Sequence, residues 1–228
     1  VDTTFNSQGA TQGILPIQIG NKIADYSARV ATGLAVQSST GDLIISAYEQ
    51  QESTDATPMV MRVVGTSGTT GLKTSPTTDQ IPGTLDLSFD TDGAIDLTSL
   101  IAAGAAKVVY TYRTNDTYEG KMLVGIDASA SSSVIIARID NTDMTLDTTF
   151  GTGGILTISS LSGLNSISLD SNGAILIAGT YSGDGWAKRL TTVGAVDVDF
   201  TIPANLAAIN SIYQQKSGRY LVAGNDDS

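Results

Sequence analysis

The sequence contains neither histidine nor cysteine among its 228 residues. Without histidine, Ser-His-Asp and Cys-His nucleophilic sites and most transition-metal sites are excluded. Without cysteine, disulfides, thiolate nucleophiles and thiolate metal ligands are excluded, although this absence identifies no compartment. We therefore expect no enzyme activity and no cofactor.

Basic residues and long apolar runs are also scarce. The chain has 12 Lys and Arg against 23 Asp and Glu, a formal net charge of −11. Nucleic acid and anionic membranes would be repelled over most of this surface, so neither is an expected partner. No stretch approaches the roughly 18 apolar residues of a membrane helix. The chain begins at Val1 without a signal-like segment, which indicates a fragment or the mature portion of a longer protein.

Glutamate is rare, whereas aspartate and glycine are abundant. Only three of the 23 acidic residues are glutamate, namely Glu49, Glu52 and Glu119, and the chain has 24 glycines. Aspartate and glycine favour turns, and the many Thr, Val and Ile residues favour strands. This composition predicts an all-β chain of short strands and tight turns.

All four phenylalanines close the same local phrase, in which an aspartate precedes the ring by three residues. The phrases are Asp2 to Phe5, Asp86 to Phe89, Asp147 to Phe150 and Asp197 to Phe200. A fixed phrase of this kind is the signature of an internal repeat.

Further phrases recur in a fixed order relative to these Asp-x-x-Phe phrases. A turn glycine opens an apolar run at Gly41, Gly120, Gly173 and Gly218, and each run follows another strand-like segment, which predicts a hairpin in every unit. An apolar strand carrying an arginine then follows in three units, with Arg62, Arg138 and Arg189. Another apolar segment follows most of the phenylalanines, as in Ile14 to Ile19, Ala94 to Leu97 and Gly154 to Ile158, and its weakest version lies between Ile202 and Leu206.

Each unit thus has up to four short antiparallel strands, the composition of a β-propeller blade. The prediction is one repeat domain over residues 1–228, a propeller or propeller fragment of about four blades, each of three to four antiparallel strands. The units are approximately 1–84, 85–145, 146–196 and 197–228, and the last ends before its arginine-bearing strand. Residues 66 to 83 are polar and are predicted to form an exposed loop.

The order of these phrases resembles the delta-60 repeat of large bacterial proteins. That repeat pairs a D-G-K-I-hydrophobic-V-A-G hairpin with an A-R-hydrophobic strand and a closing G-S-L-D-x-x-F-G. The third unit is the most similar, through Ser171 to Gly179, Ala187 to Leu190 and Val196 to Phe200. The family glycine after Phe is present at Gly151 but is Asn6, Asp90 and Thr201 elsewhere. The resemblance implies a propeller-like fold and a secreted or surface-associated bacterial protein, and it assigns no biochemical role.

The repeated aspartates and arginines have two interpretations. The aspartates could form a ring of functional acids, but a short Asp side chain that caps the following turn is favoured, with Phe inserted between neighbouring blades. The arginines could bind a ligand, but their periodicity favours a structural partner such as the Asp of a turn.

The sequence also contains three weaker candidates for a functional site. Asp90, Asp92 and Asp96 surround a glycine as in hard-cation loops, without the spacing of the helical calcium loop, so they are a weak calcium candidate and no other metal site is expected. Trp186, the single tryptophan, could stack on a sugar, although a position within a blade strand is favoured. Two facing carboxylates would suffice for glycoside hydrolysis, so a glycosidase is a distant alternative.

The leading prediction is a non-catalytic propeller module for binding or scaffolding, with a protein or glycan as ligand. A carbohydrate-binding, lectin-like module is the alternative. Because the last unit lacks its arginine-bearing strand, the chain is expected to self-associate or to pair with a strand in trans.

Overall fold

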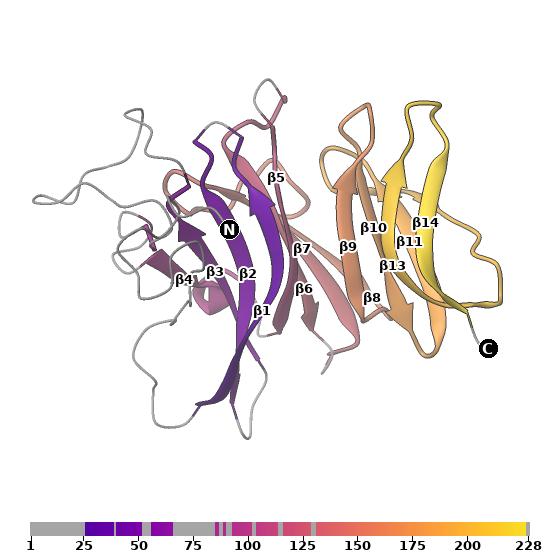
Figure 1. Cartoon of the computed structure of the whole chain (residues 1–228), viewed down its shortest axis with the longest axis horizontal. Helices are drawn as coiled ribbons and strands as arrows, with labels where there is room; N and C mark the ends of the chain where they lie inside the picture. The colour runs from indigo at the N-terminus through magenta and orange to yellow at the C-terminus, as the bar shows by residue number, and fades with distance from the viewer. Residues whose placement is uncertain are drawn as a thin grey trace, which may run out of the picture.

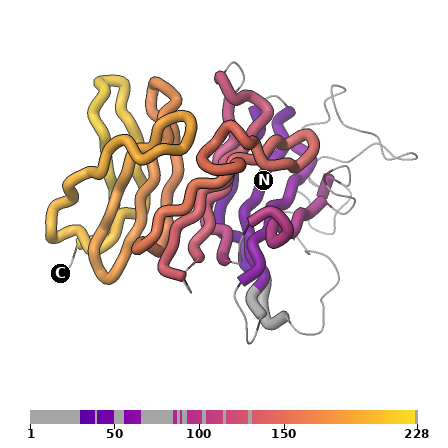
Figure 2. The backbone as a smooth tube through the Cα atoms, turned by 180° about the vertical axis from the view of Figure 1, so that it is seen from behind, coloured from indigo at the N-terminus to yellow at the C-terminus, as the bar shows by residue number. Residues whose placement is uncertain are grey.

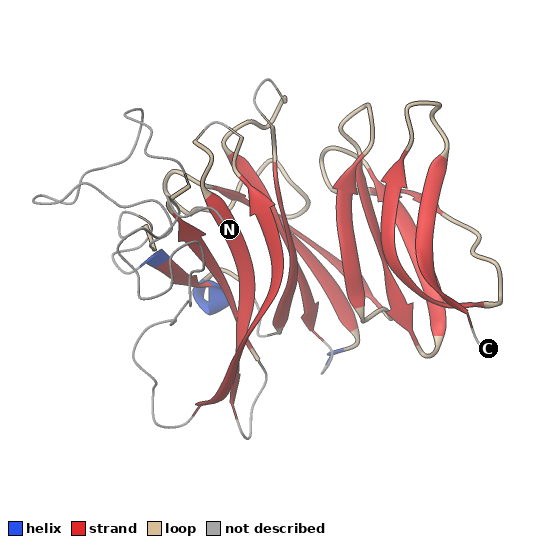
Figure 3. Ribbon diagram, viewed as in Figure 1, coloured by secondary structure: helices blue, strands red, loops and turns tan. Residues whose placement is uncertain are grey.

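The computed structural model describes residues 26–38, 40–51, 56–65, 85–86, 89, 93–101, 104–113, 116–128 and 131–226. Strands dominate these ranges, with short helical turns such as η1 (Leu97–Ser99) (Figure 3). No helix among these residues is both long and apolar enough to cross a membrane.

The described strands form four antiparallel sheets in which most strands pair with their neighbours in sequence. The first sheet contains β1 (Tyr26–Val36), β2 (Leu43–Gln51), β3 (Thr57–Val63) and β4 (Ala94–Asp96). The second contains β5 (Ala105–Thr111), β6 (Lys121–Ala128), β7 (Ser133–Asp140) and β8 (Ile155–Ser159). The third contains β9 (Leu164–Leu169), β10 (Ile175–Tyr181), β11 (Asp184–Leu190) and β12 (Val196–Asp199). The fourth contains β13 (Leu206–Gln214) and β14 (Tyr220–Asp226).

The first two strands of each sheet are joined by a turn that contains one of the repeated glycines. Gly41, Gly120, Gly173 and Gly218 have φ between 76° and 82°, a region that L side chains rarely adopt. These turns lie on the same side of the molecule, at the top of Figure 1. We call this side the turn face.

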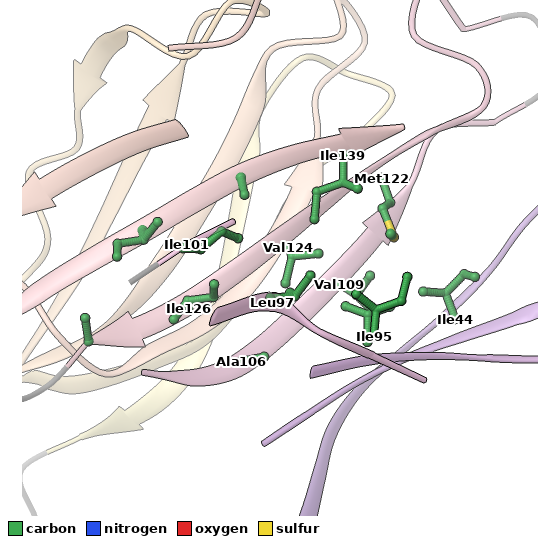
Figure 4. Close-up of a cluster of buried hydrophobic side chains, with 14 of the residues drawn as sticks. Ile44, Ile95, Leu97, Ile101, Ala106, Val109, Met122, Val124, Ile126 and Ile139 are labelled. Atoms are coloured by element: carbon green, nitrogen blue, oxygen red, sulfur yellow. The ribbon is translucent and has the colours of Figure 1, made fainter. Parts of the chain in front are cut away.

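The four sheets follow one another in chain order across the molecule, and Figure 2 shows the same succession from behind. Apolar side chains fill the space between each pair of neighbouring sheets. One cluster joins the first and second sheets through residues such as Ile44, Ile95 and Val124 (Figure 4). A second joins the second and third sheets through Leu123 and Ile177. A third joins the third and fourth sheets, and the core is thus a series of inter-sheet layers.

Every first strand carries an irregularity at an equivalent position. The pairing of β1 with β2 skips Thr32, and that of β5 with β6 skips Lys107. The skipped residues are Asn165 in β9 and Asn210 in β13. A β-bulge leaves one residue out of the ladder and redirects its side chain. These β-bulges were not predicted from the sequence.

The prediction of an all-β fold built from antiparallel hairpins and arginine-bearing strands is confirmed. The sheets are nevertheless offset from the sequence units, because β4 and β8 follow Phe89 and Phe150 yet pair with strands that precede these residues. The fourth sheet has two described strands rather than the expected three or four.

The third sheet ends differently from the first two. The sequence predicted that the last strand of this sheet follows Phe200, in the weak apolar segment around Ile202. In the structure, the strand that pairs with β11 is β12, which precedes Phe200. Residues 201–205 alone connect this region to β13, so the chain has too little length to run along β11 and return. Pro203, within this connection, also lacks an N–H for pairing.

Candidate functional site

Each arginine-bearing strand places its guanidinium against the aspartate of the following repeat phrase. Arg62 Nε donates to Asp86 Oδ2 at 2.6 Å, and Arg138 Nε donates to Asp147 Oδ2 at 2.8 Å. Arg189 forms an ion pair with Asp197 and also donates to Asp170 Oδ2 at 2.7 Å. The structure therefore brings together the repeated acids and bases of three units. Asp2 lies outside the described residues.

Two of the arginines also contact turns of the next sheet. Arg62 Nη1 donates to the carbonyl of Asn141 at 3.3 Å, and Arg138 Nη1 donates to that of Thr192 at 2.7 Å. Arg138 has no exposed side-chain surface, and its Nη2 donates to Thr149 Oγ1 at 2.9 Å. Its guanidinium carbon lies 4.9 Å from the centre of the Phe150 ring. The arginine thus holds a repeat phrase and the following sheet together.

The phenylalanines lie in successive inter-sheet layers. Phe89 belongs to the cluster between the first and second sheets, and Phe150 belongs to the next one. Both rings are buried. Phe200 is half-buried and packs on the cluster between the third and fourth sheets, 4.9 Å from the Tyr220 ring. Phe5 lies outside the described residues.

Asp147 shows how the repeated acid stabilises its turn. Its Oδ1 accepts hydrogen bonds from the Thr149 backbone N–H at 3.1 Å and from the Thr149 hydroxyl at 2.7 Å. Burial by itself raises the pKa of Asp147, but these hydrogen bonds and the charges of Arg138 and Lys121 together lower that pKa below its ordinary value. The carboxylate form is therefore the one that the fold stabilises.

Among the calcium candidates, only Asp96 belongs to the described residues. Its Oδ1 accepts hydrogen bonds from the Thr98 N–H at 2.7 Å and the Thr98 hydroxyl at 2.6 Å, and so caps η1. Asp90 and Asp92 lie outside the described residues, as do residues 66 to 83. Within the described ranges, no group of three or more acidic side chains is arranged to hold a metal ion.

The single tryptophan lies inside the protein. Trp186 is buried in the layer between the second and third sheets, and its Nε1 donates to the Ser162 carbonyl at 3.0 Å. Its ring is therefore not available to stack on a sugar. Tyr112, in the same layer, is also buried, and this burial raises its pKa to about 12.

A cleft of about 370 Å³ opens on the turn face, beside the turns of the second, third and fourth sheets. Two tyrosines, two cations and several polar groups line it, among them Tyr110, Arg113, Asp116, Tyr213 and Lys216. The sequence did not single out these tyrosines as candidate site residues. Their equivalent positions in β5 and β13, each directly opposite a leucine, were the available signal.

The residues at the bulges also form contacts between sheets. Thr32 Oγ1 donates to the Ala106 carbonyl at 2.6 Å, and Asn165 Nδ2 donates to the Ile209 carbonyl at 3.0 Å. The repeated tripeptide Asn-Ser-Ile, at residues 165–167 and 210–212, was the sequence signal that could have identified them.

No protein-family model matches the chain, and no curated protein matches it. Among solved structures the chain is similar to the Dos1 propeller, with 15% sequence identity over 82% of this chain and a TM-score of 0.47. The described strands form four antiparallel sheets that pack one on the next. The chain spans 40% of the length of that solved structure.

Proposed function

We propose that the chain is a non-catalytic β-propeller module of the delta-60 repeat type, which acts in binding or as a scaffold. The observation that carries this proposal is the outer face of the fourth sheet, the face that points away from the third sheet. We infer that this face receives a further β-sheet from a second copy of the chain.

The two outermost sheets differ at equivalent positions. Leu176 of β10 lies opposite Ser168, and Leu221 of β14 lies opposite Tyr213 at the same point of the hairpin. Leu176 is fully buried because β13 packs against it, whereas 55% of the Leu221 surface is exposed. β14 is also the edge of the described fourth sheet, although β2, β6 and β10 each have a strand on both sides. Exposed apolar surface of this kind marks an interaction site.

The polar groups that dock one sheet on the next are repeated on this face. In the third sheet, Ser168 Oγ donates to the Ile212 carbonyl at 2.8 Å, and Ser166 Oγ accepts from the Ile212 N–H at 3.2 Å. Asn165 binds the Ile209 carbonyl beside them. The fourth sheet has Asn210 and Ser211 at the positions of Asn165 and Ser166, and both are exposed. These side chains support docking of a strand similar to β13.

Sedimentation velocity over a range of micromolar concentrations tests the proposal. We expect the wild-type chain to associate with increasing concentration, and Leu221→Asp to shift the equilibrium toward the monomer because it places a charge on the apolar face. The matched control is Val193→Asp, since Val193 is 50% exposed in the turn between β11 and β12. It should associate like the wild type. A wild-type monomer at every concentration would contradict the proposal.

The cleft on the turn face favours carbohydrate binding as a second candidate function. It combines aromatic rings with amide, hydroxyl and charged groups, as saccharide sites do. A glycan array probed with and without calcium tests this candidate. The absence of binding to every sugar would remove it.

A further inference from the structure

The turn-face cleft has a composition that defines a narrower class of ligand. We propose that it binds a saccharide that carries a carboxylate group, such as a uronic-acid oligomer. This proposal rests on the carbohydrate-binding candidate above and is independent of the docking of a second copy on the fourth sheet.

Two tyrosines supply the apolar contacts. Tyr110 of β5 and Tyr213 of β13 occupy equivalent positions, and the strand between them, β9, has the short Ser168 at that position. Tyr213 is 54% exposed, while Tyr110 is half-buried. Burial raises the pKa of the Tyr110 phenol, and the adjacent Arg113 guanidinium opposes this effect. The Tyr110 phenol thus stays neutral near pH 7, and both tyrosines offer flat rings suited to the C–H face of a pyranose.

Two cations lie in the same cleft. Arg113 follows β5, and Lys216 lies in the turn between β13 and β14. In the part of the chain that the structure describes, neither takes part in an ion pair. A guanidinium and an ammonium without carboxylate partners are suited to bind an anionic group of a ligand.

The acids of the cleft cancel only part of this positive charge. Asp170 has no exposed side-chain surface, and its two oxygens accept hydrogen bonds from Arg189 Nε and from the N–H groups of Asn172 and Ala174. Asp116 is the other acid that lines the described cleft; its Oδ2 accepts the backbone N–H of Arg113 at 2.7 Å, and its single negative charge is smaller than the combined charge of Arg113 and Lys216. On a chain with a net charge of −11, this cleft therefore has a local excess of accessible positive charge.

The remaining lining groups fit hydroxyls. Ser171 lies in the turn of the third sheet, Gln214 is the last residue of β13, and Gln215 lies in the turn that follows it. Gln214 Oε1 accepts the Ser171 N–H at 2.7 Å, which ties the two turns together. A site with its turns fixed to each other loses less conformational entropy when a ligand binds.

Isothermal titration calorimetry in calcium-free buffer tests the inference with three probes: an oligogalacturonate, the neutral oligosaccharide obtained by reducing its carboxylates, and oligoglutamate. We expect binding of the oligogalacturonate, at least tenfold weaker binding of the neutral form, and a strong decrease of affinity with salt. Equal binding of the neutral form would overturn the role of the carboxylate. Equal binding of oligoglutamate would overturn the saccharide class, and no binding of any probe would overturn the site.

Substitutions in the cleft test whether the oligogalacturonate binds there. Lys216→Gln and Arg113→Gln should each weaken binding of the oligogalacturonate several-fold, and Tyr213→Ala should abolish it. Arg219→Gln is the matched control, because it removes the same charge three residues from Lys216 at an exposed residue that does not line the cleft. A loss as large in Arg219→Gln would overturn the assignment. A chain that binds the uronate but sediments as a monomer would contradict only the docking proposal.

Discussion

At the scale of single residues, Arg138 shows why a buried charge is tolerated in this protein. Its guanidinium contacts a carboxylate, a backbone carbonyl and a hydroxyl while two aromatic rings cover it, with the Tyr118 ring centre 3.7 Å away. A buried ion needs such a complete set of partners to offset the loss of its hydration. The removal of one partner should therefore cost far more than the loss of an exposed ion pair.

Replacing Asp147 tests this comparison. We expect Asp147→Ala to lower the free energy of unfolding by about 3–5 kcal/mol, because it leaves Arg138 buried without a counter-charge. Asp199→Ala removes the partner of Lys188, but the Asp199 side chain is 68% exposed, so its cost should be about 0–1 kcal/mol. Urea denaturation measures both values. Similar costs would show that the Asp147–Arg138 pair has no special role.

The lowered pKa of Asp147 predicts acid sensitivity. A carboxyl group whose pKa is lower in the folded state stabilises the fold above its unfolded pKa, near 3.8, and this stability is lost as the pH falls through the folded value. Asp140, paired with Lys121, has a lowered pKa and acts in the same direction. Unfolding free energies measured from pH 6 down to pH 3 should fall less steeply for Asp147→Asn than for the wild type. An unchanged slope would contradict this assignment.

Tyr112 predicts sensitivity at the opposite end of the pH scale. Burial raises its pKa from 10.0 to about 12, so the folded chain keeps this phenol proton between these values while the unfolded chain releases it. Stability should therefore decrease as the pH rises from 10 to 12. Tyr112→Phe should reduce that decrease, which denaturation at alkaline pH would measure.

At the scale of structural elements, glycines in turns serve different purposes. Gly218 and Gly194 both have positive φ, at 82° and 83°. A Cβ at Gly218 would meet nothing within 4 Å, whereas one at Gly194 would lie 2.7 Å from the Phe150 ring. Gly194 thus also gives the repeated phenylalanine its space.

The two glycines form a matched pair of alanine substitutions. Gly218→Ala should destabilise the protein by about 1–2 kcal/mol through the unfavourable backbone region alone. Gly194→Ala should cost a further 1–3 kcal/mol, roughly, because the added methyl displaces a buried ring. Thermal unfolding of the two variants measures the difference. Equal melting temperatures would contradict the proposed contact with Phe150.

The sequence predicted the hairpins and arginine-bearing strands because alternation and turn glycines are local signals. β10, for example, begins at Ile175, two residues after the predicted turn glycine Gly173. The offset of the sheets was not predictable, since the pairing of β4 with β3 joins segments separated by residues 64–93. The bulges were missed because one skipped residue leaves the local composition unchanged. The cleft was missed because its members come from three turns that meet only in the folded chain.

At the scale of the whole molecule, the sheets form a series in which each contacts its neighbours. Central strands such as β6 and β10 are buried on both faces, whereas β14 is largely exposed. Stability within one protein follows this difference in local packing. Hydrogen exchange, measured at concentrations too low for association, should therefore be slowest in β6 and β10 and fastest in β14. Equal protection of β10 and β14 would contradict this gradient.

The direction of the arginine contacts has a consequence for how the protein forms during translation. Arg62 and Arg138 each donate to a carbonyl of the sheet that comes later in the chain. While the ribosome is still making that later sheet, the earlier sheet holds a guanidinium whose final acceptor does not yet exist. The first and second sheets therefore complete these contacts only after the next sheet has been synthesised, and the nascent chain gains this part of its stability one sheet behind the point of synthesis.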